Sequence, residues 1–184
     1  MQHKLTDKQI ARIIAKTRKW VETIIIGLDL CPFAKAPFQK GQVHFAVGDA
    51  DTMKGFVEIF IEQLALMDKK TSIETTLLIV PALLKMEYFQ PFMQFCEETI
   101  IINHWGKTYQ IVSFHPYQRI DGLSPESPQN LISMGPYPIV HILRVESVET
   151  KGKSLKQDIQ VRNDAILKKM KKEDVLALWK KVEE

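Results

Sequence analysis

Three side chains in this sequence of 184 residues could act as a nucleophile, a base or a metal ligand. Cys31 precedes Pro32 just after an expected helix end, so a fixed turn aims its thiol. His115 follows an expected strand and opens a long connection, where a general base or a metal ligand would stand. His141 lies between Val140 and Ile142 in an apolar strand, from which it could reach a pocket across the sheet.

Each of these side chains also has a structural interpretation. The negative end of a helix dipole raises a thiol pKa, so Cys31 needs a cationic neighbour or a metal to become reactive and is otherwise a buried, inert thiol. His115 and His141 could equally be satisfied structural residues. Together the three could bind zinc or copper. The Cys31–Pro32 pair also occurs in haem-regulatory motifs. Cys96, on an aromatic helix face, is predicted to be a core residue.

A second group of polar side chains could bind an anion. In the expected closing helix, steps of three and four residues from Ile159 reach Arg162 and Asn163, so two polar side chains interrupt an apolar stripe. Arg144 follows the last expected strand. A buried guanidinium needs a carboxylate, carbonyl groups or an anionic ligand, so these residues predict either a substrate-binding clamp or an internal anchor.

No stronger catalytic motif occurs in the sequence. It contains no Gly-x-Gly-x-x-Gly, no Walker loop, no His-Glu-x-x-His, no pair of Cys-x-x-Cys and no Gly-x-Ser-x-Gly. The sequence therefore requires no particular cofactor, and the identity of any metal stays open.

The elements that position these residues follow from apolar periodicity and turn residues. The pattern predicts helices over about 7–26, from a cap at Asp49 or Asp51 to about 67, and over 90–102, 155–170 and 174–182. Strands are predicted over 42–47, 75–80, 107–114 and 138–143. A connection over 115–137 is rich in Pro, Ser and Gly.

This order predicts an α/β or α+β fold: a four-stranded, mostly parallel or mixed sheet with helices packed on it, including an N-terminal helix and two C-terminal helices. Ligands in such sheets tend to lie at the carboxyl ends of strands. A connection of 23 residues begins at one such end, at His115, and long loops are often functional. We therefore expect a polar pocket under the 115–137 loop.

Length and charge limit the class of protein. Residues 1–184 suit a single domain, and 151–184 form a basic helical segment packed on it. From Lys151 to Lys181 ten Lys or Arg residues face four Asp or Glu residues, a balance of +6. This segment is either a solvated helix face or a surface for an acidic partner or nucleic acid. We predict a cytoplasmic protein for three reasons. The sequence has only two cysteines, it has no apolar run long enough for a membrane helix, and its N-terminus is polar.

Several segments together resemble the bacterial family catalogued as domain of unknown function 1415. The resemblance is carried by Trp20, residues 26–34, residues 40–43, residues 75–78, residues 113–118, Tyr137-Pro138, residues 141–144, Ser147 and Arg162-Asn163. It spans most of the chain. It implies membership of the family and no particular activity.

These observations lead to three hypotheses of function. The first is a small enzyme with a Cys31, His115 and His141 centre that binds an anionic small molecule through Arg144, Arg162 and Asn163, with acyl or thiol transfer or metal chemistry as its reaction. The second is a non-catalytic binding protein that uses its basic C-terminal surface. The third is a metal- or haem-responsive protein.

Overall fold

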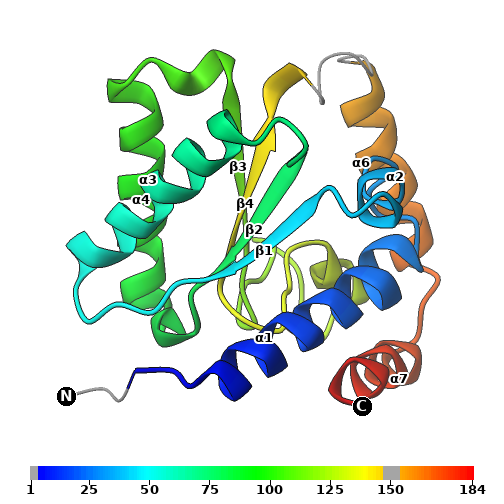
Figure 1. Ribbon diagram of the computed structural model, residues 1–184. Coiled ribbons are helices and arrows are strands. Elements are labelled where there is room, and N and C mark those ends of the chain that lie inside the picture. Colours follow the sequence, from blue (N-terminus) through cyan, green and yellow to red (C-terminus); the bar gives the residue numbers. More distant parts are fainter. Residues whose placement is uncertain (1–3, 147–153) are drawn as a thin grey trace.

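A computed structural model describes residues 4–146 and 154–184, and its centre is a four-stranded sheet (Figure 1). The strands are β1 (Val43–Val47), β2 (Thr75–Ile79), β3 (Tyr109–Phe114) and β4 (Ile139–Arg144). Their spatial order is β1-β2-β4-β3, with β1 and β2 parallel and β4 antiparallel to both its neighbours. Strands β1, β2 and β3 therefore run in one direction, and β4 runs against them.

The predicted mixed sheet is confirmed, within an α+β architecture. The pairing register aligns His141 of β4 with Leu77 on one side and Val112 on the other. Strand β2 is buried along its whole length, which suits a central strand built from Thr, Leu and Ile. The connection from β3 to β4 contains no crossover helix, so β4 pairs antiparallel with the strand that precedes it.

Helices α3 (Met53–Lys69) and α4 (Met86–Ile102) cover one face of the sheet. We call this the α4 face. Thr52 caps α3 by accepting a hydrogen bond from the Gly55 N–H at 3.1 Å, so the prediction of an aspartate cap is wrong. Helix α4 begins one turn before its predicted start, which places Pro91 inside the helix on its exposed side.

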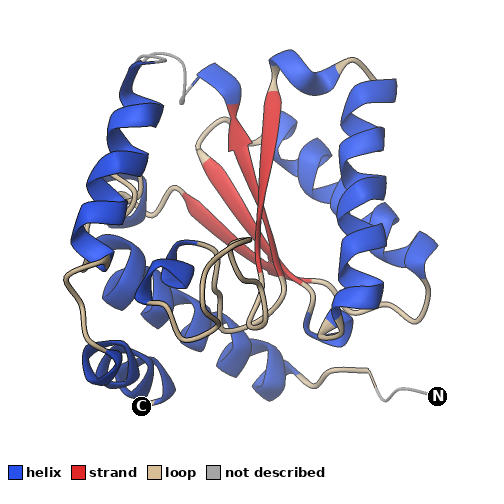
Figure 2. Ribbon diagram, turned by 180° about the vertical axis from the view of Figure 1, so that it is seen from behind, coloured by secondary structure: helices blue, strands red, loops and turns tan. Residues whose placement is uncertain are grey.

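Helix α1 (Asp7–Trp20) covers the other face and continues through a π-helical turn, η1 (Val21–Ile26). Helices α6 (Ser154–Leu167) and α7 (Lys172–Glu183) lie on the same side, together with a short helix, α2 (Lys35–Gln39), that the sequence did not predict (Figures 1 and 2). We call this the α1 face. A capping box of Thr6 and Gln9 is present at the start of α1.

The two faces enclose separate apolar clusters. On the α4 face, Phe60, Phe89 and Phe92 are fully covered and pack with Cys96. Burial raises the pKa of the Cys96 thiol far above its ordinary value, and Glu97 raises it further. Cys96 is therefore the core residue that its position in the sequence predicted.

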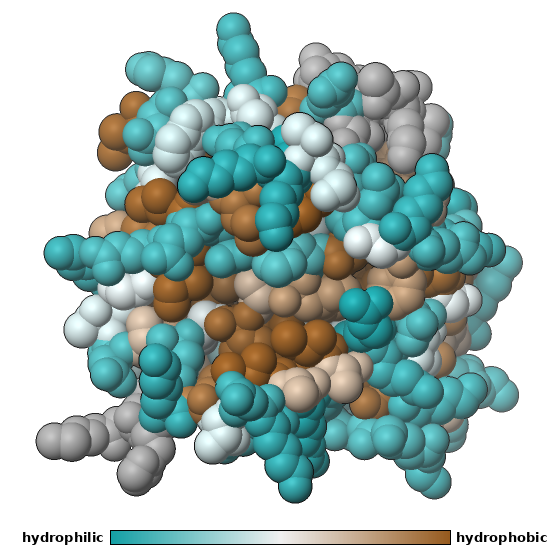
Figure 3. Space-filling model, viewed as in Figure 1, coloured by the Kyte–Doolittle hydropathy of each residue, from teal (hydrophilic) through white to brown (hydrophobic). Residues whose placement is uncertain are grey.

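The cluster on the α1 face is built around Trp20, Ile24 and Leu131. At the edge strand β1 this cluster is less completely buried, because Val43 and Val47 are only partly covered. Figure 3 shows apolar residues gathered in the middle of the surface that faces the viewer in Figure 1, with polar residues around them.

The remaining sequence predictions concern the membrane and the basic C-terminal segment. Within residues 4–146 and 154–184, no helix has the length and apolar character needed to cross a membrane. Residues 151–153 of the basic segment, and Ser147 of the family resemblance, lie outside the described residues.

Candidate functional site

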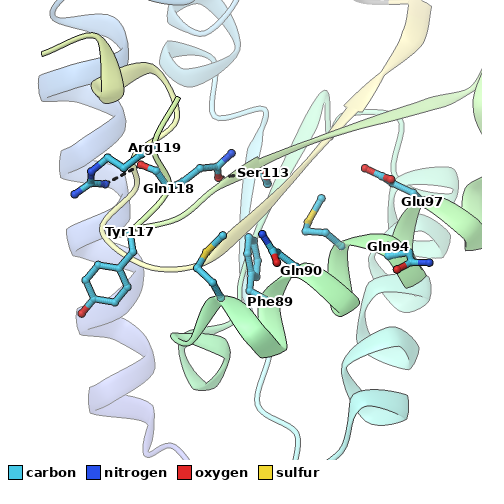
Figure 4. A pocket seen from close by; sticks show the side chains of 10 residues that line it. Phe89, Gln90, Gln94, Glu97, Ser113, Tyr117, Gln118 and Arg119 are labelled. Atoms are coloured by element: carbon cyan, nitrogen blue, oxygen red, sulfur yellow. Dashed lines mark hydrogen bonds between the residues drawn. The ribbon is translucent and has the colours of Figure 1, made fainter. Parts of the chain in front are cut away.

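A cavity of about 390 Å³ opens on the α4 face between α4 and the start of the 115–137 connection (Figure 4). It lies at the carboxyl end of β3, the strand that ends at Phe114. The cavity borders the beginning of the 115–137 connection, under which the sequence predicted a polar pocket, but none of the six predicted site residues is among those that line it. The lining residues are Met86, Phe89, Gln90, Met93, Gln94, Glu97, Ser113, Tyr117, Gln118 and Arg119.

Three carboxamide side chains dominate the polar lining of the cavity. Gln90 and Gln94 are exposed on α4, and Gln118 comes from the connection. Gln94 donates a hydrogen bond to the Glu98 carboxylate at 2.8 Å, and the Ser113 hydroxyl lies 3.4 Å from Oε1 of Gln118. Each carboxamide offers both donors and an acceptor, so this lining suits a polar ligand.

Arg119, at one end of the cavity, bonds to backbone carbonyl groups of the connection to which it belongs. Its Nη1 donates to the carbonyl oxygens of Pro116 at 3.1 Å and Gln118 at 2.7 Å, and its Nε donates to that of Pro125 at 3.1 Å. Among the described residues, Nη2 has no hydrogen-bond partner. The guanidinium is thus held in place while one of its nitrogen atoms stays available to a ligand.

Asn130 holds the same connection from inside. It lies in η4 (Pro128–Ile132), is 1% exposed, and accepts a hydrogen bond from the Ile120 N–H at 2.9 Å. Its Nδ2 donates to the carbonyl oxygens of Ser124 and Pro125 at 3.0 and 3.3 Å. The sequence prediction missed both Arg119 and Asn130. The only signal was their presence in a turn-rich segment, where Asn often bonds to nearby backbone.

His115 lies directly behind the cavity wall. It is fully buried, and its ring centroid lies 5.0 Å from that of Phe89 and 5.7 Å from that of Tyr117. Its Nδ1 accepts a hydrogen bond from the Tyr117 N–H at 3.1 Å, which fixes the proton of the neutral ring on Nε2. This contact ties Tyr117 to the end of β3.

The environment of His115 favours the neutral ring. Burial lowers the pKa of His115, and the backbone of Leu83 and Leu84 opposes that shift in part. Nε2 makes no hydrogen bond of good geometry with any described residue. Because the Nδ1 lone pair is already used by Tyr117, this geometry favours a positioning role, and the catalytic role of His115 remains a prediction.

His141 faces the opposite side of the sheet, among the residues of the α1 face. Its Nε2 lies 2.6 Å from the Thr75 hydroxyl, which itself donates to the Ile142 carbonyl at 2.7 Å. Since a hydroxyl has one proton, Nε2 of His141 must be the donor to Thr75. Burial lowers the pKa of His141 to about 4, so the ring is neutral at pH 7 with its lone pair on Nδ1.

Arg162 and Asn163 anchor the turn that leads to Cys31. Asn163 is buried and its Nδ2 donates to the Leu30 carbonyl at 2.7 Å. Arg162 forms an ion pair with the Asp29 carboxylate at 3.0 Å and also donates to the Asp29 carbonyl. Asp29 adopts the left-handed backbone conformation, with φ of 52°. Cys31 follows this turn and packs, half-buried, against the cluster of the α1 face.

Arg144 lies on the α4 face, away from Arg162. Its guanidinium donates to the carbonyl of Met67, near the C-terminal end of α3, and to that of Ile73 at 3.1 Å. It lies 6.0 Å from the centre of the Tyr109 ring, whose hydroxyl donates to Asp68. Burial, assisted by Asp68, raises the pKa of Tyr109 to about 12. A cation at this place complements the negative end of α3.

The structure therefore separates residues that the sequence grouped. His115 and Arg144 belong to the α4 face, whereas Cys31, His141, Arg162 and Asn163 belong to the α1 face. No group of three or more His, Cys, Asp or Glu side chains suited to a metal ion occurs within the described part of the chain. Cys31, His115 and His141 thus form no three-ligand metal cluster there, because the sheet lies between the two histidines.

The fold and the cavity define an α+β domain with a mixed four-stranded sheet and a carboxamide-lined cavity at the carboxyl end of an edge strand. The chain belongs to the family described as "Protein of unknown function (DUF1415)", whose family model matches residues 12–177. This match confirms the resemblance found in the sequence. Comparisons with curated proteins and with solved structures found no match.

Proposed function

We propose that this protein binds a small polar organic molecule in the cavity between α4 and the 115–137 connection. The observation that carries the proposal is the lining: three carboxamides between Arg119 and Glu97, with apolar contacts from Phe89 and methionine side chains. A volume of about 390 Å³ lies within the range of about 300–1,000 Å³ found for small-molecule sites. Polar groups around an apolar wall give such a site orientation and specificity.

The lining favours binding over catalysis. Its candidate reactive groups are the Ser113 hydroxyl and the Glu97 carboxylate, and the hydroxyl contacts a carboxamide at 3.4 Å rather than a base. A serine nucleophile needs an adjacent base to remove its proton. The proposed role is therefore recognition, with His115 holding Tyr117 in the cavity wall.

A second candidate function is the enzyme predicted from Cys31 and His141. The observation that favours it is the neutral His141 ring, which Thr75 orients so that Nδ1 carries the lone pair of a base. Arg162 and Asn163 would then act by positioning the Cys31 turn. Measuring the rate at which Cys31 reacts with a thiol probe between pH 5 and 9 tests this function; a thiolate that forms only near the ordinary pKa of about 8.5 contradicts it.

An acidic partner on the basic C-terminal segment receives less support. Lys168 pairs with Asp164 at 2.6 Å and Lys172 pairs with Glu126 at 2.8 Å, which reduces the positive charge available to nucleic acid.

Both cysteines are free thiols. We keep the cytoplasm as the proposed location, because free thiols persist in a reducing compartment.

Blocking the cavity tests the proposed function. Gln90 and Glu87 are both exposed on α4, but only Gln90 lines the cavity. We expect Gln90→Trp to fill the cavity and abolish binding of small molecules found in a ligand-observed NMR screen of polar compounds. Glu87→Trp, the matched control, should leave binding unchanged. Hits that bind Gln90→Trp as well as the wild type would contradict the proposal.

A further inference from the structure

We infer that the ligand of this cavity is a short zwitterionic peptide whose carboxylate lies at Arg119 and whose amino group lies at Glu97. This inference rests on the proposed function and names the ligand class. It is carried by the opposite charges at the two ends of the cavity, the volume of the cavity, and the carboxamides between those ends.

The charges stand at opposite ends. Figure 4 shows Arg119 beside Tyr117 at one end of the cavity and Glu97 beside Gln94 at the other. Glu97 is exposed and forms no ion pair with another described residue, and Nη2 of Arg119 has no hydrogen bond among the described residues. A guanidinium is suited to a carboxylate, and a carboxylate is suited to an ammonium group. A ligand with charge of one sign only meets an unfavourable charge at one end.

The volume of the cavity limits the length of the ligand. About 390 Å³ lies near the lower end of the range of about 300–1,000 Å³ found for small-molecule sites. Each residue adds about 3.3–3.6 Å to an extended chain. The ligand is therefore a peptide of a few residues, and a longer peptide would carry one of its charges beyond the cavity.

The middle of the cavity matches a peptide backbone. A side-chain carboxamide carries the same donor and acceptor groups as a peptide bond, and Gln90, Gln94 and Gln118 supply three of them. Glu98 takes one N–H of Gln94, which leaves the carboxamide oxygen of Gln94 as an acceptor. Phe89, Met86 and Met93 provide apolar and adaptable contacts for small ligand side chains.

Calorimetry with four probes at pH 7 tests the inference without altering the protein. The probes are trialanine, N-acetyl-trialanine, trialanine amide and hexa-alanine; at pH 7 the free amino group is mainly charged. We expect trialanine to bind about fivefold more tightly than either blocked form, because each blocked form loses one charged contact. Hexa-alanine should bind more weakly than trialanine. Equal binding of the first three probes would overturn the inference.

A charge-removing variant assigns the amino group to Glu97. In Glu97→Gln we expect trialanine and N-acetyl-trialanine to bind equally, while the preference of trialanine over its amide persists. Glu62→Gln, an exposed carboxylate of α3 outside the cavity lining, is the control and should behave as the wild type. A full preference for the free amino group in Glu97→Gln would overturn the assignment. Circular dichroism shows whether the variant is folded, and the four-probe series stands without it.

The outcomes separate this inference from the proposed function. One outcome is that none of the four probes binds, while another small molecule binds the wild type but not Gln90→Trp. The peptide inference then fails and the small-molecule site stands. If no small molecule from the screen or the probe series binds, both fail.

Discussion

The two faces of the sheet use polar side chains in different ways. On the α1 face, polar side chains bond to other parts of the protein. Asn163 and Arg162 hold the turn before Cys31, and Thr75 holds the ring of His141. On the α4 face, Gln90 and Glu97 point from an exposed helix surface into a cavity. Polar residues in an apolar stripe are thus the ones that stabilise the fold, and polar residues on an exposed helix face are the ones available to a ligand.

Acid should affect the α1 face most strongly. The pKa of His141 is about 4 in the folded protein and about 6.5 when unfolded, so the unfolded state binds more protons between these values. The free energy of unfolding should therefore fall as the pH drops from about 6.5 to 4, by about 3 kcal/mol in total. The lowered pKa of His115 adds to the loss in the same direction.

Urea unfolding at pH 7 and pH 4.5 measures this loss. His141→Leu should show a shallower pH dependence than the wild type. His104→Asn is the control, because His104 is exposed and Asn tolerates its left-handed backbone conformation. Equal slopes for the wild type and His141→Leu would mean that burial of His141 does not favour the neutral ring.

Removing Asn130 should affect the cavity more than the rest of the fold. Asn130→Ala leaves the Ile120 N–H without its partner and removes the side-chain hydrogen bonds to the Ser124 and Pro125 carbonyls, at a cost of about 2 kcal/mol. Since the same connection carries Tyr117, Gln118 and Arg119, ligand affinity should fall as well. Thermal unfolding and calorimetry measure the two effects.

Asn163→Ala provides the comparison, because Asn163 holds the turn before Cys31 rather than the 115–137 connection. It removes one buried hydrogen bond, to the Leu30 carbonyl, and should cost about 1 kcal/mol while cavity binding stays unchanged. Loss of cavity binding in Asn163→Ala, or its retention in Asn130→Ala, would remove the functional distinction between the 115–137 connection and the turn before Cys31.

The smallest effect is expected at the Asp29–Arg162 ion pair. Its side chains are 67% and 38% exposed, so the pair contributes below about 1 kcal/mol to stability. Asp29→Asn keeps the tolerance for positive φ and should change the midpoint of unfolding by a few degrees at most. A larger loss would show that the carboxylate itself fixes the turn before Cys31.

Much of the fold could be predicted from periodicity alone. The pattern of apolar residues located the four strands and the long helices within a few residues, because burial of one face repeats along the chain. The start of α4 was predicted too late because Pro91 is expected in a first turn, and α2 was missed because five residues give no periodic signal. The length of the 115–137 connection predicted a pocket beneath it, and the cavity borders the start of that connection.

The residues of the cavity could not be predicted in the same way. Gln90, Gln94 and Glu97 resemble any solvated helix face, since nothing local distinguishes a glutamine that meets a loop from one that meets water. Conversely, Arg162 and Asn163 interrupt an apolar stripe and Arg144 follows the last strand, and the sequence left open whether these residues bind a ligand or anchor the fold. In the structure their donors bond to the carbonyl groups of Asp29, Leu30 and Met67.

The sequence by itself determined which faces of the strands and long helices are covered, because hydrophobic burial there depends on patterns only a few residues long. Tertiary structure decided which polar groups meet. The antiparallel insertion of β4 between β2 and β3 places His141 and His115 on opposite sides of the sheet, and the packing of the connection against α4 encloses the cavity. Such pairings join residues far apart along the chain, and no local pattern records them.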